Sequence, residues 1–356
     1  MILLMKCMSK LSIIILLLLM ASCGSTRQVA IKAMEPAQVD LSHKIVRVGV
    51  LNTVEHLEKP DLGDGINRLV AIEDQWLNSK GQDAAVLALI EELRKDSRFE
   101  VEALDASEGS LESSDHDSAD ISWSKIKSIC EKHNIDALFS LTHFDAETQV
   151  SFRKTKMEQL NMMREKESIS AQEITLETLI ENGWRIYDPF LEKIVDEYTY
   201  NQQIISKAKG VDPVSALRAI GSRKDSILSK GKITGNSYGE RLKPNERKIF
   251  RKYFVKGTEK LVQAGESMAS GDLHAAIELW TEEVGNSKTK IKGRACYNLA
   301  VGMELGGDLE RALEWATMAN ENLNDKISQR YLTELESRIS QQVIVEAQLA
   351  QLYFDD

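Results

Sequence analysis

Residues 44–53 read KIVRVGVLNT and decide the fold of the first half of the chain. The aliphatic, mostly β-branched side chains of this stretch favour a buried strand, and the polar pair Asn52-Thr53 ends it. The residues that follow, 55–80, contain a proline and two glycines, and another glycine follows at position 81. We therefore expect a loop with short turns between the first strand and the next element.

Strands and helices alternate after this loop. Residues 83–96 repeat their apolar side chains at helical spacing, and Arg98 to Leu104 alternate apolar with polar side chains. Ser122 is suited to cap a second helix over Trp123 to His133, and Ala137 to Phe144 form a third apolar run. This order predicts an α/β layer with helices packed on a sheet.

Three further segments favour strands, namely Ile174 to Ile180, Gly183 to Tyr187 and Lys193 to Tyr200. The dipeptide Asn182-Gly183 between the first two is typical of a tight hairpin turn. We therefore expect a mixed sheet, with a parallel part that is followed by an antiparallel meander.

The order of elements resembles a small α/β domain of several envelope lipoproteins and of the amino-terminal part of the Tol-system propeller protein. The matching residues are Phe99-Glu100-Val101 in one strand and Asp136-Ala137-Leu138 in the next. The resemblance covers residues 44–205, which we take as the α/β domain, and it carries no catalytic motif.

Residues 206–257 are polar and rich in glycine, and we expect a junction with short helices there, one of them near Val214 to Lys230. The segment from Tyr238 to Pro244, with Arg241 inside it, resembles a segment of an uncharacterised family of Gram-negative envelope lipoproteins. In that family tyrosine, arginine and proline precede a helical tail.

A repeat marks the carboxyl-terminal part, residues 258–356. Gly271-Asp272-Leu273 and Gly307-Asp308-Leu309 each precede an Ala-[Ile/Leu]-Glu sequence at the same offset, 36 residues apart. The pattern resembles the tetratricopeptide repeat, whose unit of 34 residues is two helices. The resemblance implies an all-α domain of stacked helix pairs, with glycine at the tight turns.

Two repeats bury little surface, so such a domain needs caps. We expect a helix over Lys326 to Leu352 at one end and a helix over Asn245 to Phe254 at the other. The alternative interpretation is an ordinary helical bundle in which the sequence Gly-Asp-Leu occurs twice by chance.

The first residues of the chain predict its location in the cell. Lys6 and Lys10 precede a short apolar run, and small residues then lead to Cys23. Such a run is too short to span a bilayer and is typical of a secretory signal. The cysteine makes it resemble a bacterial lipoprotein signal, which implies a signal peptide over residues 1–22, acylation of Cys23 and a lipidated tether over residues 23–43. The alternative is a plain signal peptide with an accidental cysteine.

The formal net charge of −10 argues against nucleic acid as a partner and against strong electrostatic attraction to anionic lipids. Membrane attachment would therefore depend on acyl chains at Cys23. Gly24-Ser25 lacks the aspartate that retains some lipoproteins at the inner membrane, so we expect the outer membrane and the periplasm-facing side.

No catalytic or metal-binding motif stands out. The six histidines are isolated, and His116 lies among aspartates in what we expect to be a solvated loop over residues 106–120. The sequence contains no phosphate loop, dinucleotide fingerprint or nucleophile elbow, and we expect no metal and no cofactor. Cys130 and Cys296 are expected to be buried apolar residues, with a disulfide between them as the alternative.

Two functions remain open. The first is a non-catalytic scaffold that binds another envelope protein or peptide in a groove of the helical repeats, at Arg294, Tyr297, Asn298 and Val301. The second is an enzyme or a small-ligand or glycan-binding protein with a cleft between the α/β domain and the junction, near His143, Tyr238 and Arg241.

Overall fold

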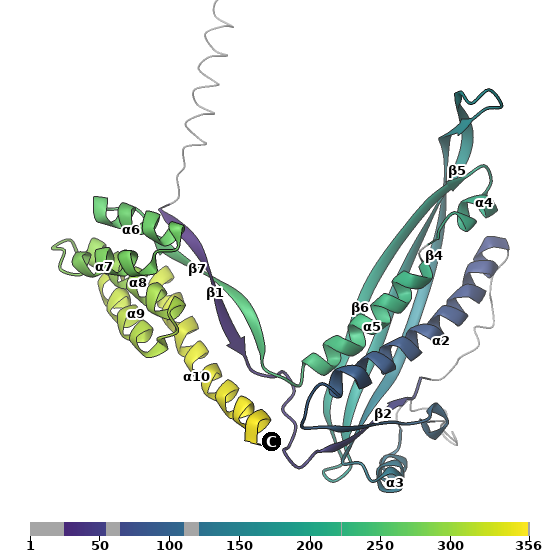
Figure 1. The fold of residues 1–356 in the computed structure, drawn as a ribbon, viewed down its shortest axis with the longest axis horizontal. Helices are drawn as coiled ribbons and strands as arrows, with labels where there is room; N and C mark the ends of the chain where they lie inside the picture. Colours follow the sequence, from purple (N-terminus) through teal and green to yellow (C-terminus); the bar gives the residue numbers. More distant parts are fainter. Residues whose placement is uncertain (1–24, 55–64, 110–120, 222, 355–356) are drawn as a thin grey trace, which may run out of the picture. The chain divides into compact units, whose positions relative to one another are not determined.

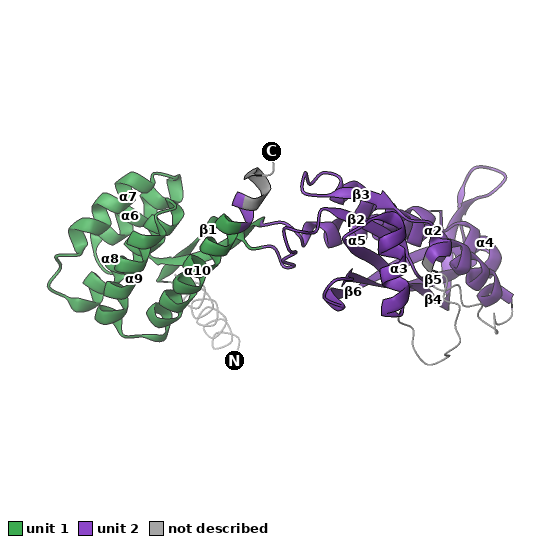
Figure 2. Ribbon diagram, turned by 90° about the horizontal axis from the view of Figure 1, so that it is seen from below, with its two compact units in different colours: residues 1–36, 245–347 green, residues 37–244, 348–356 purple. Residues whose placement is uncertain are grey.

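The computed structural model describes residues 25–54, 65–109, 121–221 and 223–354. They form two units, one from residues 25–36 and 245–347 (unit 1) and one from residues 37–244 together with the last residues of the chain (unit 2; Figure 2). The architecture is an α/β region with a mixed sheet and an all-helical carboxyl-terminal region, as predicted. The signal peptide, Cys23 and His116 lie outside the described residues.

A five-stranded sheet organises unit 2, with the order β3-β2-β4-β5-β6. Its strands are β2 (Arg47–Asn52), β3 (Glu100–Ala103), β4 (Ala137–Leu160), β5 (Lys166–Asp188) and β6 (Lys193–Gly210). β2 pairs with β3 and β4 in parallel, and β4, β5 and β6 pair antiparallel. The prediction of a mixed sheet is confirmed.

Helices cover both faces of this sheet (Figure 1). They are α2 (Gly65–Leu93), the short 3-10 helix η1 (Ala106–Gly109), α3 (Trp123–His133), α4 (Pro213–Arg218) and α5 (Arg223–Glu240). Phe139 of β4 is buried against α2 and α5, whereas its neighbour Leu138 is buried in the cluster around α3. This alternation follows from the two-residue period of a strand.

Some helix boundaries differ from the prediction. The loop predicted over residues 55–80 is wrong from Gly65 onward, because α2 begins there. Gly81 does not break this helix: a Cβ at that position would lie 2.4 Å from the Phe144 ring, so the glycine allows close packing. The single helix predicted over Val214 to Lys230 is instead two helices, α4 and α5.

The hairpin predicted at Asn182-Gly183 is wrong. Both residues lie in the middle of the continuous strand β5, where Asn182 is fully buried and donates a hydrogen bond to Thr234 Oγ1 at 3.2 Å. The turns of the meander lie instead between β4 and β5 and between β5 and β6. A buried polar partner therefore overrides the local turn preference of the dipeptide.

In its described residues, unit 1 combines five helices with a two-stranded ribbon. Its elements are β1 (Thr26–Glu35), β7 (Asn245–Phe254), α6 (Glu259–Ser270), α7 (Leu273–Glu283), α8 (Thr289–Leu305), α9 (Leu309–Leu323) and α10 (Lys326–Phe354). Gly271 and Gly307 end α6 and α8 near φ values of 87° and 86°, as the predicted tight turns require. The helix predicted over Lys326 to Leu352 is confirmed.

Two predictions about the segments that form the ribbon are wrong. The segment predicted as tether contains the strand β1, and the segment predicted as a capping helix, Asn245 to Phe254, is the strand β7. The two strands pair antiparallel along their whole length, from Thr26 opposite Phe254 to Glu35 opposite Asn245. Ile31 of β1 is buried in unit 1, so this apolar burial explains why the segment is ordered.

Candidate functional site

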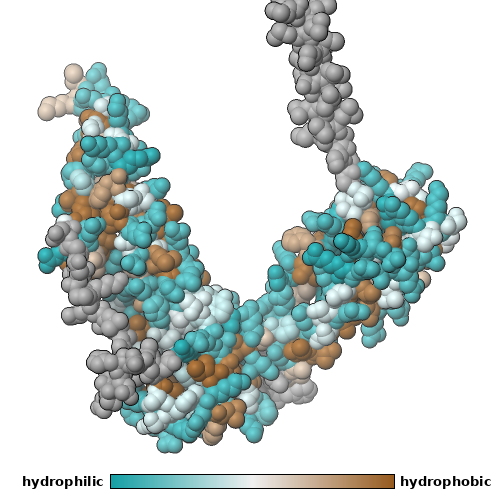
Figure 3. All heavy atoms as spheres, turned by 180° about the vertical axis from the view of Figure 1, so that it is seen from behind, coloured by the Kyte–Doolittle hydropathy of each residue, from teal (hydrophilic) through white to brown (hydrophobic). Residues whose placement is uncertain are grey.

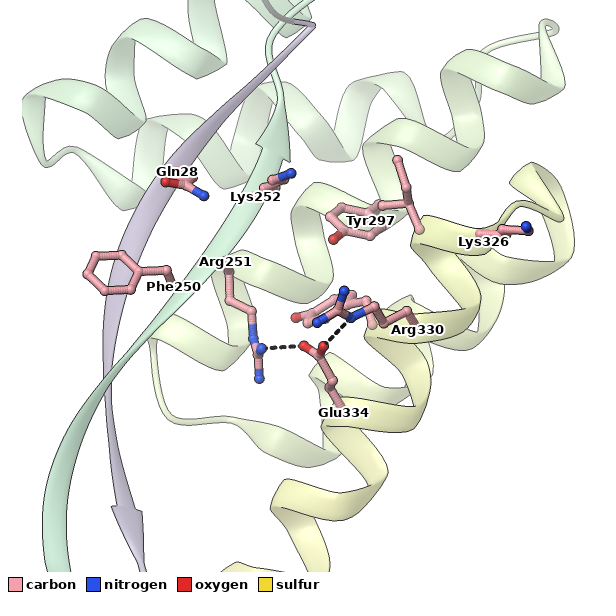
Figure 4. A pocket seen from close by; sticks show the side chains of 10 residues that line it. Gln28, Phe250, Arg251, Lys252, Tyr297, Lys326, Arg330 and Glu334 are labelled. Carbon is pink, nitrogen blue, oxygen red and sulfur yellow. Dashed lines mark hydrogen bonds and ion pairs between the residues drawn. The ribbon is translucent and has the colours of Figure 1, made fainter.

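A hollow of about 460 Å³ lies between the β1–β7 ribbon and helix α10 in unit 1 (Figure 4). Strand β7 contributes three consecutive residues, and α10 contributes residues spaced along one helical face. Gln28 of β1 and Tyr297 of α8 complete the wall. The lining residues are Gln28, Phe250, Arg251, Lys252, Tyr297, Lys326, Ile327, Arg330, Tyr331 and Glu334.

The charge of this hollow is unbalanced, because four cationic side chains and one carboxylate line it. Glu334 pairs with Arg251 at 2.6 Å and with Arg330 at 2.7 Å. Lys252 and Lys326 form no ion pair with any residue that the structure describes. The hollow therefore offers cationic groups to an anionic ligand.

A buried carboxylate behind the hollow positions Arg251. Glu304 of α8 is almost fully buried and accepts hydrogen bonds from Arg251 Nε at 2.9 Å, from the Tyr331 hydroxyl at 2.9 Å and from Arg338. Burial lowers the pKa of Arg251, but the hydrogen bond and charge of Glu304 raise that pKa more, so the net shift is upward. Arg251 is thus a fixed cation at the base of the hollow.

Aromatic rings line the same hollow. The ring centroids of Tyr297 and Tyr331 lie 4.9 Å apart, and the Arg251 guanidinium lies 5.5 Å from the Tyr331 ring centre. Burial is the main cause that raises the pKa of both phenols above the ordinary value. The rings therefore stay neutral over the physiological pH range, and because they are 4% and 3% exposed they form the packed wall of the hollow.

A second hollow adjoins the first along α10, beyond the Arg251–Glu334 ion pair. It measures about 290 Å³ and is lined by both strands of the ribbon and by the next turns of α10. Arg251 and Glu334 line both hollows, and the second hollow adds Glu35 and Arg338, the latter paired with Glu304. We call the two hollows together the ribbon groove.

The structure brings only one of the four predicted groove residues to the ribbon groove, namely Tyr297. Asn298 is fully buried, and its side chain accepts a hydrogen bond from Phe254 N and donates one to Phe254 O, both at 2.7 Å. The Arg294 side chain donates to the Lys256 carbonyl at 2.6 Å, and Val301 is buried in the core. As a site open to a foreign peptide this prediction is wrong, because the chain's own strand β7 and the residues after it occupy the position.

Tyr238 and Arg241, the alternative predicted site, contact side chains of their own unit. Tyr238 of α5 stacks on Trp184 of β5 with ring centroids 5.4 Å apart. Arg241 forms an ion pair with Asp196 at 3.0 Å and lies 4.0 Å from the Tyr198 ring centre. Burial, followed by the nearby Asp196 carboxylate, raises the pKa of Tyr238. His143 is exposed at an irregularity in the β4–β5 pairing and is not part of this cluster.

Cys130 and Cys296 are both free thiols and buried, as predicted. Burial raises the pKa of Cys130 to about 12, so this thiol stays protonated. Within the described ranges, no group of three histidine, cysteine or acidic side chains is arranged to hold a metal ion. Among the same residues, no helix has the length and hydropathy of a membrane-spanning segment.

Five residues of the ribbon groove were not predicted from the sequence: Arg251, Lys252, Lys326, Arg330 and Glu334. One feature of the sequence could have indicated them: in a strand over residues 245–254, successive side chains point to opposite faces. Because a helix was predicted over this segment, the alternation of its side chains was not recognised. The pairing with α10 had no sequence signal, because the two elements lie more than 70 residues apart.

This fold and groove define a protein that combines an α/β unit with a helical unit bearing a ribbon. Residues 45–254 match the family model described as "Domain of unknown function (DUF8603)", and because they make up more than half of the chain, the chain belongs to that family. Residues 262–337 match a second model, "Domain of unknown function (DUF6340)".

No curated protein matches the chain. A crystal structure described as a neuraminyllactose-binding hemagglutinin homolog from Helicobacter pylori is similar to it at 14% sequence identity. The match covers 55% of this chain and 90% of that chain, with a TM-score of 0.24. A similarity at this TM-score supports no conclusion about function.

Proposed function

We propose that this chain is a lipid-anchored envelope protein without catalytic activity, and that its helical unit binds an acidic segment of another envelope protein in the ribbon groove. The observation that carries the proposal is the excess of cationic over acidic side chains in the groove, next to tyrosine rings. Carboxylates of a partner would accept charge-assisted hydrogen bonds from these cations.

The groove suits an extended segment better than a single small anion. Two hollows follow one another along α10 and share Arg251 and Glu334, so a bound chain could run along both of them. The cations that form no ion pair with another described residue, Lys252 and Lys326, line the first hollow, whereas Arg338 in the second hollow pairs with Glu304. A segment whose acidic residues lie at the first hollow matches this distribution of charge.

The anchor in this proposal is Cys23, which lies outside the described residues. Its support is the signal-like sequence before it, with two lysines, a short apolar run and small residues. An outer-membrane, periplasm-facing position follows from the same signal and from Gly24-Ser25. The tether is shorter than the sequence predicts, because β1 begins at Thr26.

Photocrosslinking in the native cell tests the binding proposal. A photoreactive amino acid replaces Ile327, which lines the groove, or Ile344, which is on the same helix outside the two hollows. The two isoleucines are matched, since they are 47% and 49% exposed. We expect a defined partner to crosslink at position 327, through a segment with net negative charge.

The double substitution Lys326→Glu/Arg330→Glu should abolish this crosslink, because it reverses the charge of the first hollow. Equal crosslinking at both positions would contradict the proposal. A crosslinked segment that is neutral or basic would contradict it as well, and so would a crosslink that survives the charge reversal.

A further inference from the structure

The β4–β5 hairpin ends in a turn whose side chains are apolar and exposed. Met162 is fully exposed, Met163 is 77% exposed and Leu160 is 61% exposed. Turns of this kind usually carry glycine, asparagine, aspartate or serine. Figure 1 shows that the hairpin extends past the other elements of unit 2, and Figure 3 shows hydrophobic colour at its end.

The backbone of this turn is hydrogen-bonded within itself. Asn161 N donates to the Glu165 carbonyl, and Arg164 N donates to the Asn161 carbonyl, both at 2.9 Å. The Asn161 side-chain oxygen accepts from the amides of Met163 and Glu165, also at 2.9 Å. Strand pairing continues up to Leu160 opposite Lys166. An apolar medium penalises backbone groups that lack partners, and these hydrogen bonds provide partners for four amides of the turn.

The outer part of the hairpin carries more cations than carboxylates. Lys154, Lys156 and Arg164 are exposed and form no ion pair with another described residue, whereas Lys166 pairs with Glu158 at 3.2 Å. Exposed Glu165 and Glu167 also lie near the turn, so residues 151–172 carry five cations and three carboxylates, a net charge of +2 that contrasts with −10 for the whole chain. Cations beside exposed apolar side chains match the chemistry of an anionic bilayer surface.

From this combination we infer that the hairpin tip inserts into the interfacial region of an anionic lipid bilayer. Leu160, Met162 and Met163 enter the boundary between headgroups and acyl chains, while Lys154 and Lys156 contact lipid phosphates. Three side chains at one turn are too few for a specific protein interface, which buries about 800 Å² on each partner. The inference adds a second membrane contact to the acylated cysteine and does not depend on the ribbon groove.

The turn between β5 and β6 provides an internal control. Phe190 and Leu191 in that turn are 81% and 71% exposed, so they are comparably apolar and accessible. They lie at the opposite end of β5, whose length separates the two turns by roughly 70 Å at the usual rise per residue. One flat bilayer is therefore not expected to contact both turns through the same sheet.

The experiment uses the mature chain with Cys23→Ser, so that no acyl chain brings the protein to the bilayer. An environment-sensitive fluorophore is attached to a cysteine introduced by Met162→Cys or by Leu191→Cys. The native thiols Cys130 and Cys296 are buried, and the chain without an introduced cysteine gives the background labelling. The probes are phosphatidylcholine vesicles with and without phosphatidylglycerol.

We expect the emission of the label at position 162 to shift to the blue with vesicles that contain phosphatidylglycerol, and the label at position 191 to stay unchanged. Lys154→Glu/Lys156→Glu should weaken the binding of the labelled chain about tenfold or more. Unchanged emission at position 162 would overturn the inference, and so would equal shifts at both positions or equal shifts with both kinds of vesicle.

Discussion

At the scale of single residues, Glu304 joins three elements of the helical unit. Its carboxylate on α8 accepts from Arg251 on β7 and from Tyr331 and Arg338 on α10. Removal of one partner from a buried ion pair leaves uncompensated charge and costs about 3–5 kcal/mol. We expect Glu304→Ala to lower the free energy of unfolding of unit 1 by about that amount, measured by urea denaturation.

Glu336 is the matched control, because it is an exposed glutamate on α10. Glu336→Ala should change the unfolding free energy by less than about 0.5 kcal/mol. If both substitutions changed the free energy of unfolding by the same small amount, Glu304 would not hold β7 and α10 together.

The pKa of Glu92 in α2 makes the stability of unit 2 depend on pH. Burial raises the pKa of Glu92, but hydrogen bonds from Lys243 and Lys95, together with their charges, lower it more, so the net pKa is below the ordinary 4.5. A pKa that is lower in the folded state contributes stability above the unfolded value, and this contribution is lost as the pH falls through the folded value.

We therefore expect Glu92→Gln to destabilise unit 2 at neutral pH and to differ less from the native chain as the pH falls below about 4.5. Urea midpoints measured from neutral to acidic pH check this expectation. A difference that stayed constant across that pH range would show that the Glu92 charge does not contribute.

Local signals identified single residues correctly where the partner is close in sequence. Ser122 caps α3 by accepting from Lys125 N, and Gly271 ends α6 with positive φ, as predicted. Asn298 was predicted to line a groove for a partner peptide, and it instead holds an extended backbone of its own chain. Its partner is Phe254 of the same chain, and no pattern in the sequence distinguishes that strand from a foreign peptide.

At the scale of elements, α2 and α5 pack with their backbones in close approach. A Cβ on Gly235 would lie 2.1 Å from the Ala85 carbonyl oxygen, and one on Gly231 would lie 2.6 Å from the Gly81 carbonyl oxygen. An added methyl group would therefore push the helices apart. We expect Gly235→Ala to lower the unfolding free energy of unit 2 by about 1–3 kcal/mol, measured by denaturant titration.

Gly221→Ala is the control, since a Cβ there would meet nothing within 4 Å. This change should be neutral or slightly stabilising, because alanine restricts the unfolded chain more than glycine does. A loss at position 221 as large as that at position 235 would contradict the close-approach explanation.

The inner part of β4 could be predicted from its buried apolar side chains, and its outer part could not. The first part of β4 alternates between two packed faces, whereas residues 151–160 are exposed or half-buried on both faces and show no apolar period. The outer part of the hairpin was therefore missed. The β1–β7 pairing was missed because its two strands are more than 200 residues apart in the sequence.

At the scale of the whole molecule, the ribbon joins the beginning of the described chain to the helical unit. Ile31 and Ala33 of β1 are buried in unit 1. Deletion of residues 26–35 should therefore speed amide hydrogen exchange in α8 of unit 1 and leave exchange in β2 of unit 2 unchanged. The control is Lys32→Ser/Phe250→Ser, which changes only exposed ribbon side chains. Equal exchange in the deletion variant and the native chain would show that β1 does not support unit 1.

The ribbon groove is the central claim at this scale, and the affinity for the acidic segment that crosslinks at Ile327 tests it most directly. Fluorescence anisotropy with that segment, labelled, compares the native chain with Lys326→Ala/Arg330→Ala and with Lys193→Ala/Lys232→Ala. The second pair removes the same charge from exposed lysines in unit 2. We expect the groove pair to weaken binding about tenfold or more, and the control pair to leave it nearly unchanged. Equal effects of the two pairs, or none from the groove pair, would contradict binding in the ribbon groove.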